Sequence, residues 1–430
     1  MEISAIVKIL FVFLGVLVCS RLKLPLGLAL MGGGLGLEVW AGKQPLAILA
    51  DLAHALSRPE LWLLMLNITL ILEFGYFMAE ESNSNTIISA ARRWGGRHGR
   101  AFSLILIPAA IGLVPMPGGA LFSAPMVGQA VKENNWSPAW KAAVNYWFRH
   151  VLEYWWPLYP VVIVTLSIFT IESWQFMAVQ IPFTLVSIAA GYFFLLRNHS
   201  QALQVQPADD TRHSSVLKVL LPILLIVLCT LLLPPFYHLL FPDATPATSK
   251  LLSMLTGLLA GLFLLNNSMK HTAGQRLFRF LFTLKTGNVL LTFGGVMIFQ
   301  ALLETSGLLP QAARQLTETQ VPLTVIIGFL PFLAGLVTGI AIGYAGTAFP
   351  LIVGLMAVEG TGLTPISTLV LAFTMGYAGM MLSPVHLCFV LTREYFTASY
   401  VKVLLYLMPC VLTVAAYGIM LHLLLKIPGW

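Results

Sequence analysis

The residues best suited to chemistry form one short run, Arg149-His150-Val151-Leu152-Glu153-Tyr154, inside a largely apolar stretch over residues 139–170. At about 1.5 Å per helical residue, Arg149 would lie about 15 Å into that stretch, near the middle of a membrane. A charge at that depth costs about 2.5 kcal/mol or more and must be compensated. Arg149 and His150 could therefore face an anionic substrate or a coupling proton. Alternatively, Arg149 and Glu153 could pair with each other on one helix face, because they stand at i and i+4.

A second candidate site is the run at 114–125, Val-Pro-Met-Pro-Gly-Gly-Ala-Leu-Phe-Ser-Ala-Pro. Its prolines remove backbone donors, and Gly118 and Gly119 permit conformations closed to other residues. The apolar arms on either side have about a dozen residues each, whereas a membrane span needs about 20. We therefore expect a re-entrant hairpin over 101–131 whose tip is buried in protein or lines a wet cavity. A kinked pair of ordinary helices is the alternative.

The chain contains a second copy of this pattern. LIPAAIGLVPMPGG (106–119) resembles FLPFLAGLVTGIAIGYAG (329–346), and FSAPMVG (122–128) resembles AFPLIVG (348–354). The proline pairs 138/157 and 365/384 have the same separation. These matches predict a second hairpin over 321–358 with its tip at Gly343–Gly346.

The stretch over 139–170 has 32 residues, about 48 Å as a helix, so it must tilt or break. Pro157 and Pro160 offer a break, and Gly376-Tyr377-Ala378-Gly379 with Ser383-Pro384-Val385-His386 marks the same place in the second copy. For His386, a hydrogen-bonded packing histidine and a site residue both remain open. The predicted substrate-binding residues are Gly118, Gly119, Ser123, Asn145, Arg149, His150, Thr338, Gly346, Thr347, Tyr377, Ser383 and His386. The predicted coupling-ion residues are Glu153, Ser123 and Thr347.

Composition places these elements in a membrane. Of 430 residues, 58% are hydrophobic and 10% charged, against about 25% charged in a soluble domain. The sequence predicts an all-α polytopic protein with an extra N-terminal helix (1–23), repeat 1 (24–196), a linker with a connecting helix (197–249) and repeat 2 (250–430). If the N-terminus lies outside and both hairpins are re-entrant, most lysines and arginines face the inside, as membrane proteins prefer. The two hairpins then enter from opposite faces, which makes the repeat inverted in topology.

Several other chemistries lack their motifs. There is no Gly-x-Gly-x-x-Gly run, no phosphate-binding loop with Lys-Ser/Thr, no nucleophile elbow and no clustered His and Cys metal set. Cys19, Cys229, Cys388 and Cys410 lie in apolar stretches and are expected to be packing residues. The net charge of +7 belongs to short loops, so it does not indicate nucleic-acid binding. We therefore expect no metal and no cofactor other than Na⁺ or H⁺ as a coupling ion.

Three motifs carry a resemblance to a known family: VPMPGGALFSAPMV (114–127), GTAFPLIVGL (346–355) and GYAGMMLSPVHLC (376–388). Together they resemble the prokaryotic membrane family called domain of unknown function 401, over nearly the whole chain. That family is similar to the ion transporter superfamily, which includes gluconate, citrate and dicarboxylate carriers. The resemblance implies inverted repeats with paired hairpins and elevator-type alternating access. The Ser-Asn-Thr hairpin signature of the dicarboxylate carriers is absent from both tips, so their specificity and Na⁺ sites are not carried over.

The expected function is secondary active transport of a small organic anion across the cytoplasmic membrane by a multi-pass protein that is not an enzyme. The expected partners are the anion and the lipid bilayer, a homodimer is left open, and nucleic acid is excluded. Two alternatives remain at this point: an intramembrane enzyme using His150, Glu153 or His386, and a passive anion channel.

Overall fold

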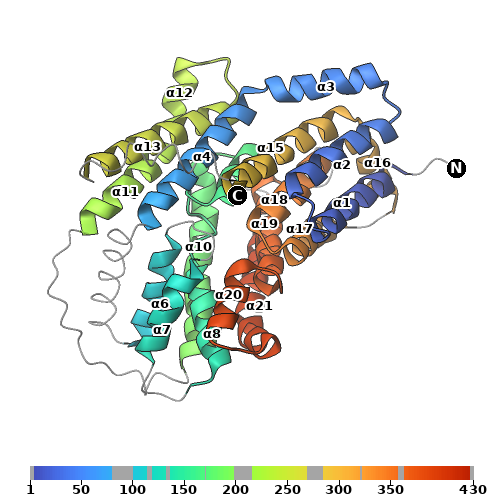
Figure 1. The fold of residues 1–430 in the computed structure, drawn as a ribbon. Coiled ribbons are helices and arrows are strands. Elements are labelled where there is room, and N and C mark those ends of the chain that lie inside the picture. Colours follow the sequence, from blue (N-terminus) through green and yellow to red (C-terminus); the bar gives the residue numbers. More distant parts are fainter. Residues whose placement is uncertain are drawn as a thin grey trace.

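The computed structural model describes residues 4–79, 100–113, 119–131, 136–169, 171–197, 216–268, 284–319, 322–356 and 363–426. All regular structure within these ranges is helical (Figure 1). Five helical segments are long and apolar enough to cross a membrane, and seven are if each of two bent pairs counts as one span. The chain is therefore an all-α, multi-pass membrane protein, as predicted.

One group of helices carries the N-terminal part of the chain. It contains α1 (Ala5–Arg21), α2 (Leu26–Trp40), α3 (Pro45–Ser57), α4 (Pro59–Ala79), α15 (Leu284–Thr305) and α16 (Leu308–Thr319). The helices α2 and α15 approach closely because glycines face the contact on both sides. A Cβ at Gly27 would overlap the carbonyl oxygen of Leu291, and a Cβ at Gly295 would overlap Gly27. The helices α11 (Val216–Leu232), α12 (Pro234–Leu240) and α13 (Pro246–Ser268) form a neighbouring group that contacts α4 through α13.

The remaining helices repeat one order twice. The first set is α6 (Arg100–Gly112), α7 (Ala120–Ala130), α8 (Pro138–Arg149), α9 (Pro160–Ile168) and α10 (Ser173–Gly191), which continues into a π-helical turn at Tyr192–Leu196. The second is α17 (Leu323–Thr338), α18 (Ala341–Met356), α19 (Pro365–Leu382), α20 (Leu387–Tyr395) and α21 (Tyr400–Leu424). Each set is a side-by-side helix pair, then a broken helix, then a long helix.

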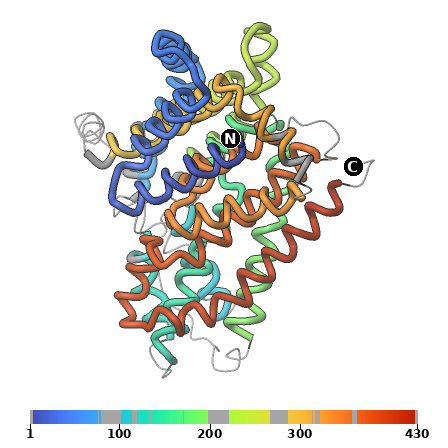
Figure 2. Tube along the Cα trace, turned by 90° about the vertical axis from the view of Figure 1, so that its right-hand side faces the viewer, coloured from blue at the N-terminus to red at the C-terminus, as the bar shows by residue number. Residues whose placement is uncertain are grey.

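The two sets contact each other reciprocally. Helix α9 of the first set packs on α18 of the second, and α20 of the second packs on α7 of the first. The two long helices, α10 and α21, also pack on each other, and both are visible in Figure 2. Such reciprocal packing is what a pseudo-two-fold arrangement of the two sets produces.

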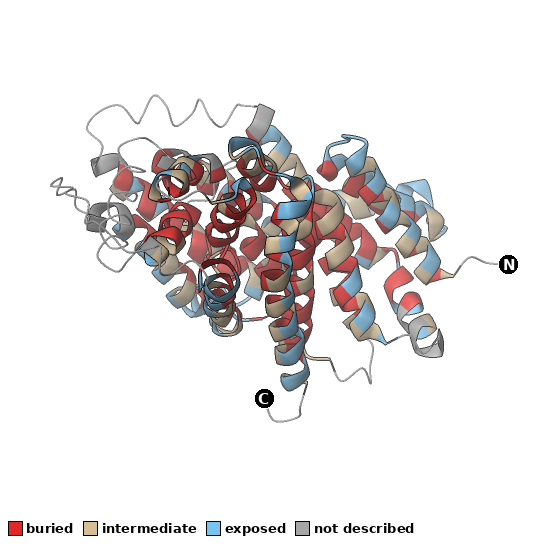
Figure 3. Ribbon diagram, turned by 90° about the horizontal axis from the view of Figure 1, so that it is seen from below, coloured by how far each residue is buried: buried red, intermediate tan, exposed pale blue. Residues whose placement is uncertain are grey.

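The second broken helix lies at the centre of the protein. In its most apolar window 83% of the residues are buried, against 33% for Tyr400–Leu424. Figure 3 shows the buried residues concentrated in the interior and the exposed ones on the outer helices. Helix α17 approaches α19 closely, and the glycine at 379 permits this approach. A Cβ at Gly379 would overlap the carbonyl oxygen of Phe332 in α17.

The turn of the second helix pair differs from the prediction. Helix α17 ends at Thr338, and Gly339 adopts a left-handed conformation with φ +66°, so the turn lies at Gly339–Ile340. The predicted tip residues Gly343 and Gly346 instead lie inside α18. In the first pair, Val114–Gly118 lie outside the described residues. Gly119 has a right-handed conformation with φ −52°, so its backbone does not require a glycine.

Candidate functional site

Two broken helices provide the frame of the candidate site. Helix α8 ends at Arg149 and α9 begins at Pro160, with a run of turns between them. Helix α19 ends at Leu382 and α20 begins at Leu387. A proline lies at or between each pair of ends and cannot donate the next helical hydrogen bond. The predicted break of the 139–170 stretch, and the predicted break beside Pro384, are therefore confirmed.

In each half of the chain, a side chain from the helix break caps the first helix of the helix pair, close to the turn of that pair. Tyr159 donates to the carbonyl of Gly112 at 2.6 Å, at the end of α6. Ser383 donates to the carbonyl of Leu336 at 2.7 Å, near the end of α17. A helix leaves its last carbonyls without intrahelical donors, and buried ones must be satisfied by other groups. Both breaks therefore fix the ends of the adjoining helix pairs, by the same device in each half of the chain.

Arg149 lies at the first break and is 1% exposed. Its Nη1 donates to the Tyr159 hydroxyl at 2.7 Å and lies 3.5 Å from Glu153 Oε1. The i, i+4 pairing of Arg149 with Glu153 is thus present in this conformation. Through Tyr159, the guanidinium is also connected to the end of α6, beside the first turn. The charge predicted deep in the membrane is compensated within its own break.

The two halves are joined by tyrosines at the breaks. Tyr377 of α19 donates to the carbonyl of His150 at 2.6 Å, at the C-terminus of α8. Tyr146 of α8 donates to the carbonyl of Met381 at 3.2 Å, near the C-terminus of α19. Each phenol satisfies a carbonyl at the end of the other half's helix. Tyr377 was predicted as a site residue, whereas Tyr146 was not.

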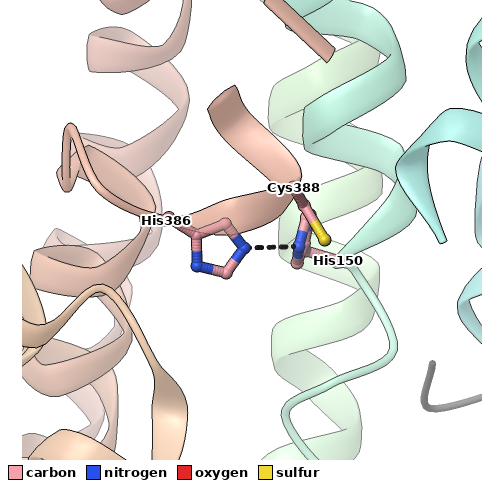
Figure 4. A group of neighbouring side chains, drawn as sticks. All are labelled: His150, His386 and Cys388. Carbon is pink, nitrogen blue, oxygen red and sulfur yellow. Dashed lines mark hydrogen bonds between the residues drawn. The ribbon is translucent and has the colours of Figure 1, made fainter. Parts of the chain in front are cut away.

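A compact cluster of His150, His386 and Cys388 lies between the breaks (Figure 4). The two Nε2 atoms are 3.2 Å apart, and the ligand atoms of all three residues lie within 4.8 Å of one another. His150 Nε2 also lies 3.8 Å from Glu153 Oε1. The prediction that no clustered His and Cys set exists is therefore wrong in three dimensions. The chain brings together residues that no local spacing connects, and the buried Cys388 is one of them.

Asn145 connects the first helix pair to the second broken helix. Its Nδ2 donates to the carbonyl of Ala120 and to the hydroxyl of Thr392, both at 3.1 Å. Ser123 donates to the same Ala120 carbonyl at 3.2 Å. Among the described residues, the buried Asn145 Oδ1 has no hydrogen-bond partner. An orphaned buried carbonyl of this kind requires an explanation, and a donor brought by a ligand is one.

Thr338, Gly346 and Thr347 make other contacts. Thr347 donates to the carbonyl of Gly343 at 2.6 Å, and Thr338 donates to that of Ala334 at 2.7 Å, both four residues back in their own helices. Gly346 faces α15, where a Cβ would overlap Val296. Gly118 lies outside the described residues. Within the described part of the chain, Thr347 therefore bonds inside α18 and Gly346 packs on α15, rather than on the cluster at the breaks.

The arrangement combines an anion-binding group with ligands for cations. A guanidinium can hold a carboxylate by two parallel hydrogen bonds. Imidazole, thiol and carboxylate groups can hold a proton or a metal ion. Arg149, His150, His386 and Cys388 are 1%, 1%, 8% and 8% exposed, so the site is closed in this conformation. A ligand of this site therefore needs a conformational change to enter or leave.

The sequence of the chain matches a known family, and its fold matches that of a solved structure. A family model described as protein of unknown function (DUF401) matches residues 3–425. Among solved structures, the chain is similar to the crystal structure of the YdaH transporter of Alcanivorax borkumensis, whose description notes an unusual topology. The TM-score is 0.59 and the identity 14%, over 89% of this chain and 87% of that chain. No curated protein sequence matches the chain. The chain has the fold of a membrane transporter, and it belongs to the DUF401 family.

Proposed function

We propose that this protein is a secondary active transporter that moves a small organic anion across the cytoplasmic membrane by alternating access. The observation that carries the proposal is the buried Arg149 guanidinium at the break of a repeated helix. Its partners are Tyr159 and Glu153, both side chains of the same break. A substrate carboxylate would replace Glu153 as the partner of Arg149. It would accept two parallel hydrogen bonds from the guanidinium.

The repeated helix order supports alternating access. Two similar sets of helices in reciprocal contact can exchange roles when the protein opens to one side or the other. We propose that the two helix pairs are re-entrant hairpins that enter from opposite faces, so that the breaks lie near the middle of the bilayer. Repeat 1 would then span 24–196 and repeat 2 would span 250–430.

The coupling ion is H⁺ or Na⁺ in this proposal. Glu153, which pairs with Arg149, and Ser123, which shares the carbonyl of Ala120 with Asn145, are the candidate ligands for this ion. Thr347 is a weaker candidate ligand, because its hydroxyl is bonded within its own helix. An intramembrane enzyme is less well supported, because the two histidines direct their Nε2 atoms at each other and the site is closed. A passive channel would need an open path, which this conformation does not provide at the break.

The test is a thermal-shift screen of the purified full-length protein against gluconate, citrate and succinate, each with and without Na⁺. A ligand present at 100 times its dissociation constant stabilises the folded state by about 2.7 kcal/mol, which raises the unfolding midpoint. We expect one class of organic anion to raise the midpoint in the wild type, and Arg149→Lys to reduce that shift. If the anion raises the unfolding midpoint of Arg149→Lys as much as that of the wild type, the anion binds at residues other than Arg149. No shift for a broad panel of mono-, di- and tricarboxylates would overturn the proposed substrate class.

A further inference from the structure

The two histidines at the breaks have their tautomers fixed by the backbone. His150 Nδ1 lies 2.6 Å from the carbonyl oxygen of Tyr146, and His386 Nδ1 lies 2.7 Å from that of Gly339. A carbonyl oxygen can only accept, so each Nδ1 carries the hydrogen and donates it. In the neutral form of each ring, Nε2 therefore presents a lone pair.

These two lone pairs face each other at 3.2 Å. Two neutral rings would place two acceptors in contact, and two imidazolium rings would place two buried positive charges in contact. Both arrangements are unfavourable in a buried site. A single electrophile between the Nε2 atoms, a proton or a metal ion, satisfies both lone pairs at once.

The third member of the cluster favours a metal ion over a proton. Cys388 brings its Sγ within 4.8 Å of a ring nitrogen of each histidine, whereas one shared proton needs only two acceptors. Metal-binding histidines usually donate their other ring hydrogen to a carbonyl or carboxylate, as both histidines do. We propose that His150, His386 and Cys388 bind a thiophilic metal ion such as Zn²⁺ between the two helix breaks.

The separation of the two histidine nitrogens fits this ion. Bonds of about 2.0–2.1 Å at a tetrahedral angle separate two nitrogen ligands by about 3.3–3.4 Å, close to the observed 3.2 Å. Cys388 would bind as the thiolate, and its proton would pass to the solvent. Glu153, whose Oε1 lies 3.8 Å from His150 Nε2, is a charged neighbour of the cluster. Its charge, together with the thiolate, offsets that of the metal and of Arg149.

The ligands come from both halves of the chain. His150 caps the C-terminus of α8, whereas His386 and Cys388 lie at the start of α20. The bound ion would therefore join the two broken helices and stabilise the conformation described above. This inference does not depend on the organic anion or on transport, because metal binding is measured on the purified protein alone.

The experiment measures binding of Zn²⁺ to chelator-treated full-length protein in detergent by isothermal titration calorimetry. Co²⁺ serves as a spectroscopic probe of the thiolate. The ligand variants are His150→Gln, His386→Gln and Cys388→Ser. The matched controls are His422→Gln and Cys410→Ser. His422 is also buried, and its Nδ1 lies 2.7 Å from a carbonyl oxygen, but its Nε2 meets no hydrogen-bond partner in the part of the chain that the structure describes.

We expect one Zn²⁺ per chain in the wild type and in both controls. Loss of an outer-shell partner weakens metal binding 10–100-fold, so each ligand variant should weaken it by at least about 100-fold. The thiolate-to-cobalt charge-transfer band should disappear in Cys388→Ser and persist in Cys410→Ser. Zn²⁺ should raise the unfolding midpoint of the wild type and not that of the ligand variants, whose midpoints without metal verify that they fold.

Three results would overturn the proposal. The wild type could bind no metal, which would leave the shared proton as the electrophile between the histidines. The three ligand variants could bind Zn²⁺ as tightly as the wild type, which would place the ion at other residues. Alternatively, the charge-transfer band could survive in Cys388→Ser, which would exclude the thiol.

Discussion

The buried pair of Arg149 and Glu153 allows a double-mutant cycle that separates a substrate role from a structural one. At the observed Nη1–Oε1 distance of 3.5 Å and an effective dielectric constant of about 20, the attraction is about 5 kcal/mol. Breaking a buried pair by removing one partner typically costs about 3–5 kcal/mol, because a buried charge is left unpaired. We therefore expect Arg149→Ala alone to destabilise the protein by about 3–5 kcal/mol. We expect the double variant with Glu153→Ala to recover most of that loss.

The assay is unfolding of the wild type, both single variants and the double variant in detergent, followed by uptake in proteoliposomes. Residues in direct contact couple by up to about 3 kcal/mol in such cycles, while independent residues add within about 0.5 kcal/mol. A coupling below about 0.5 kcal/mol would refute the electrostatic reasoning. If the double variant folds but does not take up the anion, whereas Glu153→Ala alone still does, Arg149 binds substrate. Wild-type uptake in the double variant would show that Arg149 only compensates Glu153.

Three further predictions concern the fork, the packing and the topology. Arg149→Lys keeps the charge but loses the planar fork, so it should weaken anion binding at least 10-fold in a titration while the unfolding midpoint stays close to that of the wild type; unchanged affinity would contradict bidentate binding. Gly379→Val should destabilise the protein by about 2 kcal/mol or more, because the valine would overlap a carbonyl oxygen of α17. The control Gly36→Val should change stability by about 0.5 kcal/mol, because a Cβ at Gly36 meets no atom within 4 Å. Equal unfolding midpoints for the two variants would refute the close contact. Single cysteines at Arg100 and Lys132 should be labelled by an impermeant maleimide from the same side of the membrane, and labelling from opposite sides would rule out a re-entrant first hairpin.

The helix breaks could be predicted because their causes are local. An apolar stretch too long for one span, containing prolines, must tilt or break, and residues 139–170 break as expected between α8 and α9. The pairing of Arg149 with Glu153 could also be predicted, because i, i+4 positions share a helix face. The repeated helix pairs followed from the same kind of pattern.

The turn of the second helix pair could not be located from its glycines. Residues 339–346 contain three of them, and any could supply a left-handed conformation. Only Gly339 does so, because its N–H continues the hydrogen bonding of α17 back to Gly335. Gly346 serves a different purpose, which is close packing on α15. Local sequence does not distinguish these two uses of glycine.

The partners at the breaks could not be predicted, because they are distant in sequence. His150 and His386 are 236 positions apart, and Asn145 and Thr392 are 247 positions apart. The signal that was available is the repeat itself. The shift of 227 positions that relates the prolines 138 and 157 to 365 and 384 places Arg149 and His150 opposite Gly376 and Tyr377, and it gives no signal for Cys388. The same shift places Tyr159 opposite His386, so Tyr159 could have been considered from the repeat.

The most direct test of the proposed transport is accumulation of the anion identified by thermal shift in proteoliposomes that contain the wild-type protein. An imposed inward Na⁺ or H⁺ gradient should drive the labelled anion above its external concentration, and dissipating that gradient with an ionophore should abolish the accumulation. We expect this accumulation to saturate with substrate and to be lost in Arg149→Ala with Glu153→Ala. Equilibration only to the external concentration, unaffected by the gradient, would identify a channel and contradict the proposal of a secondary transporter.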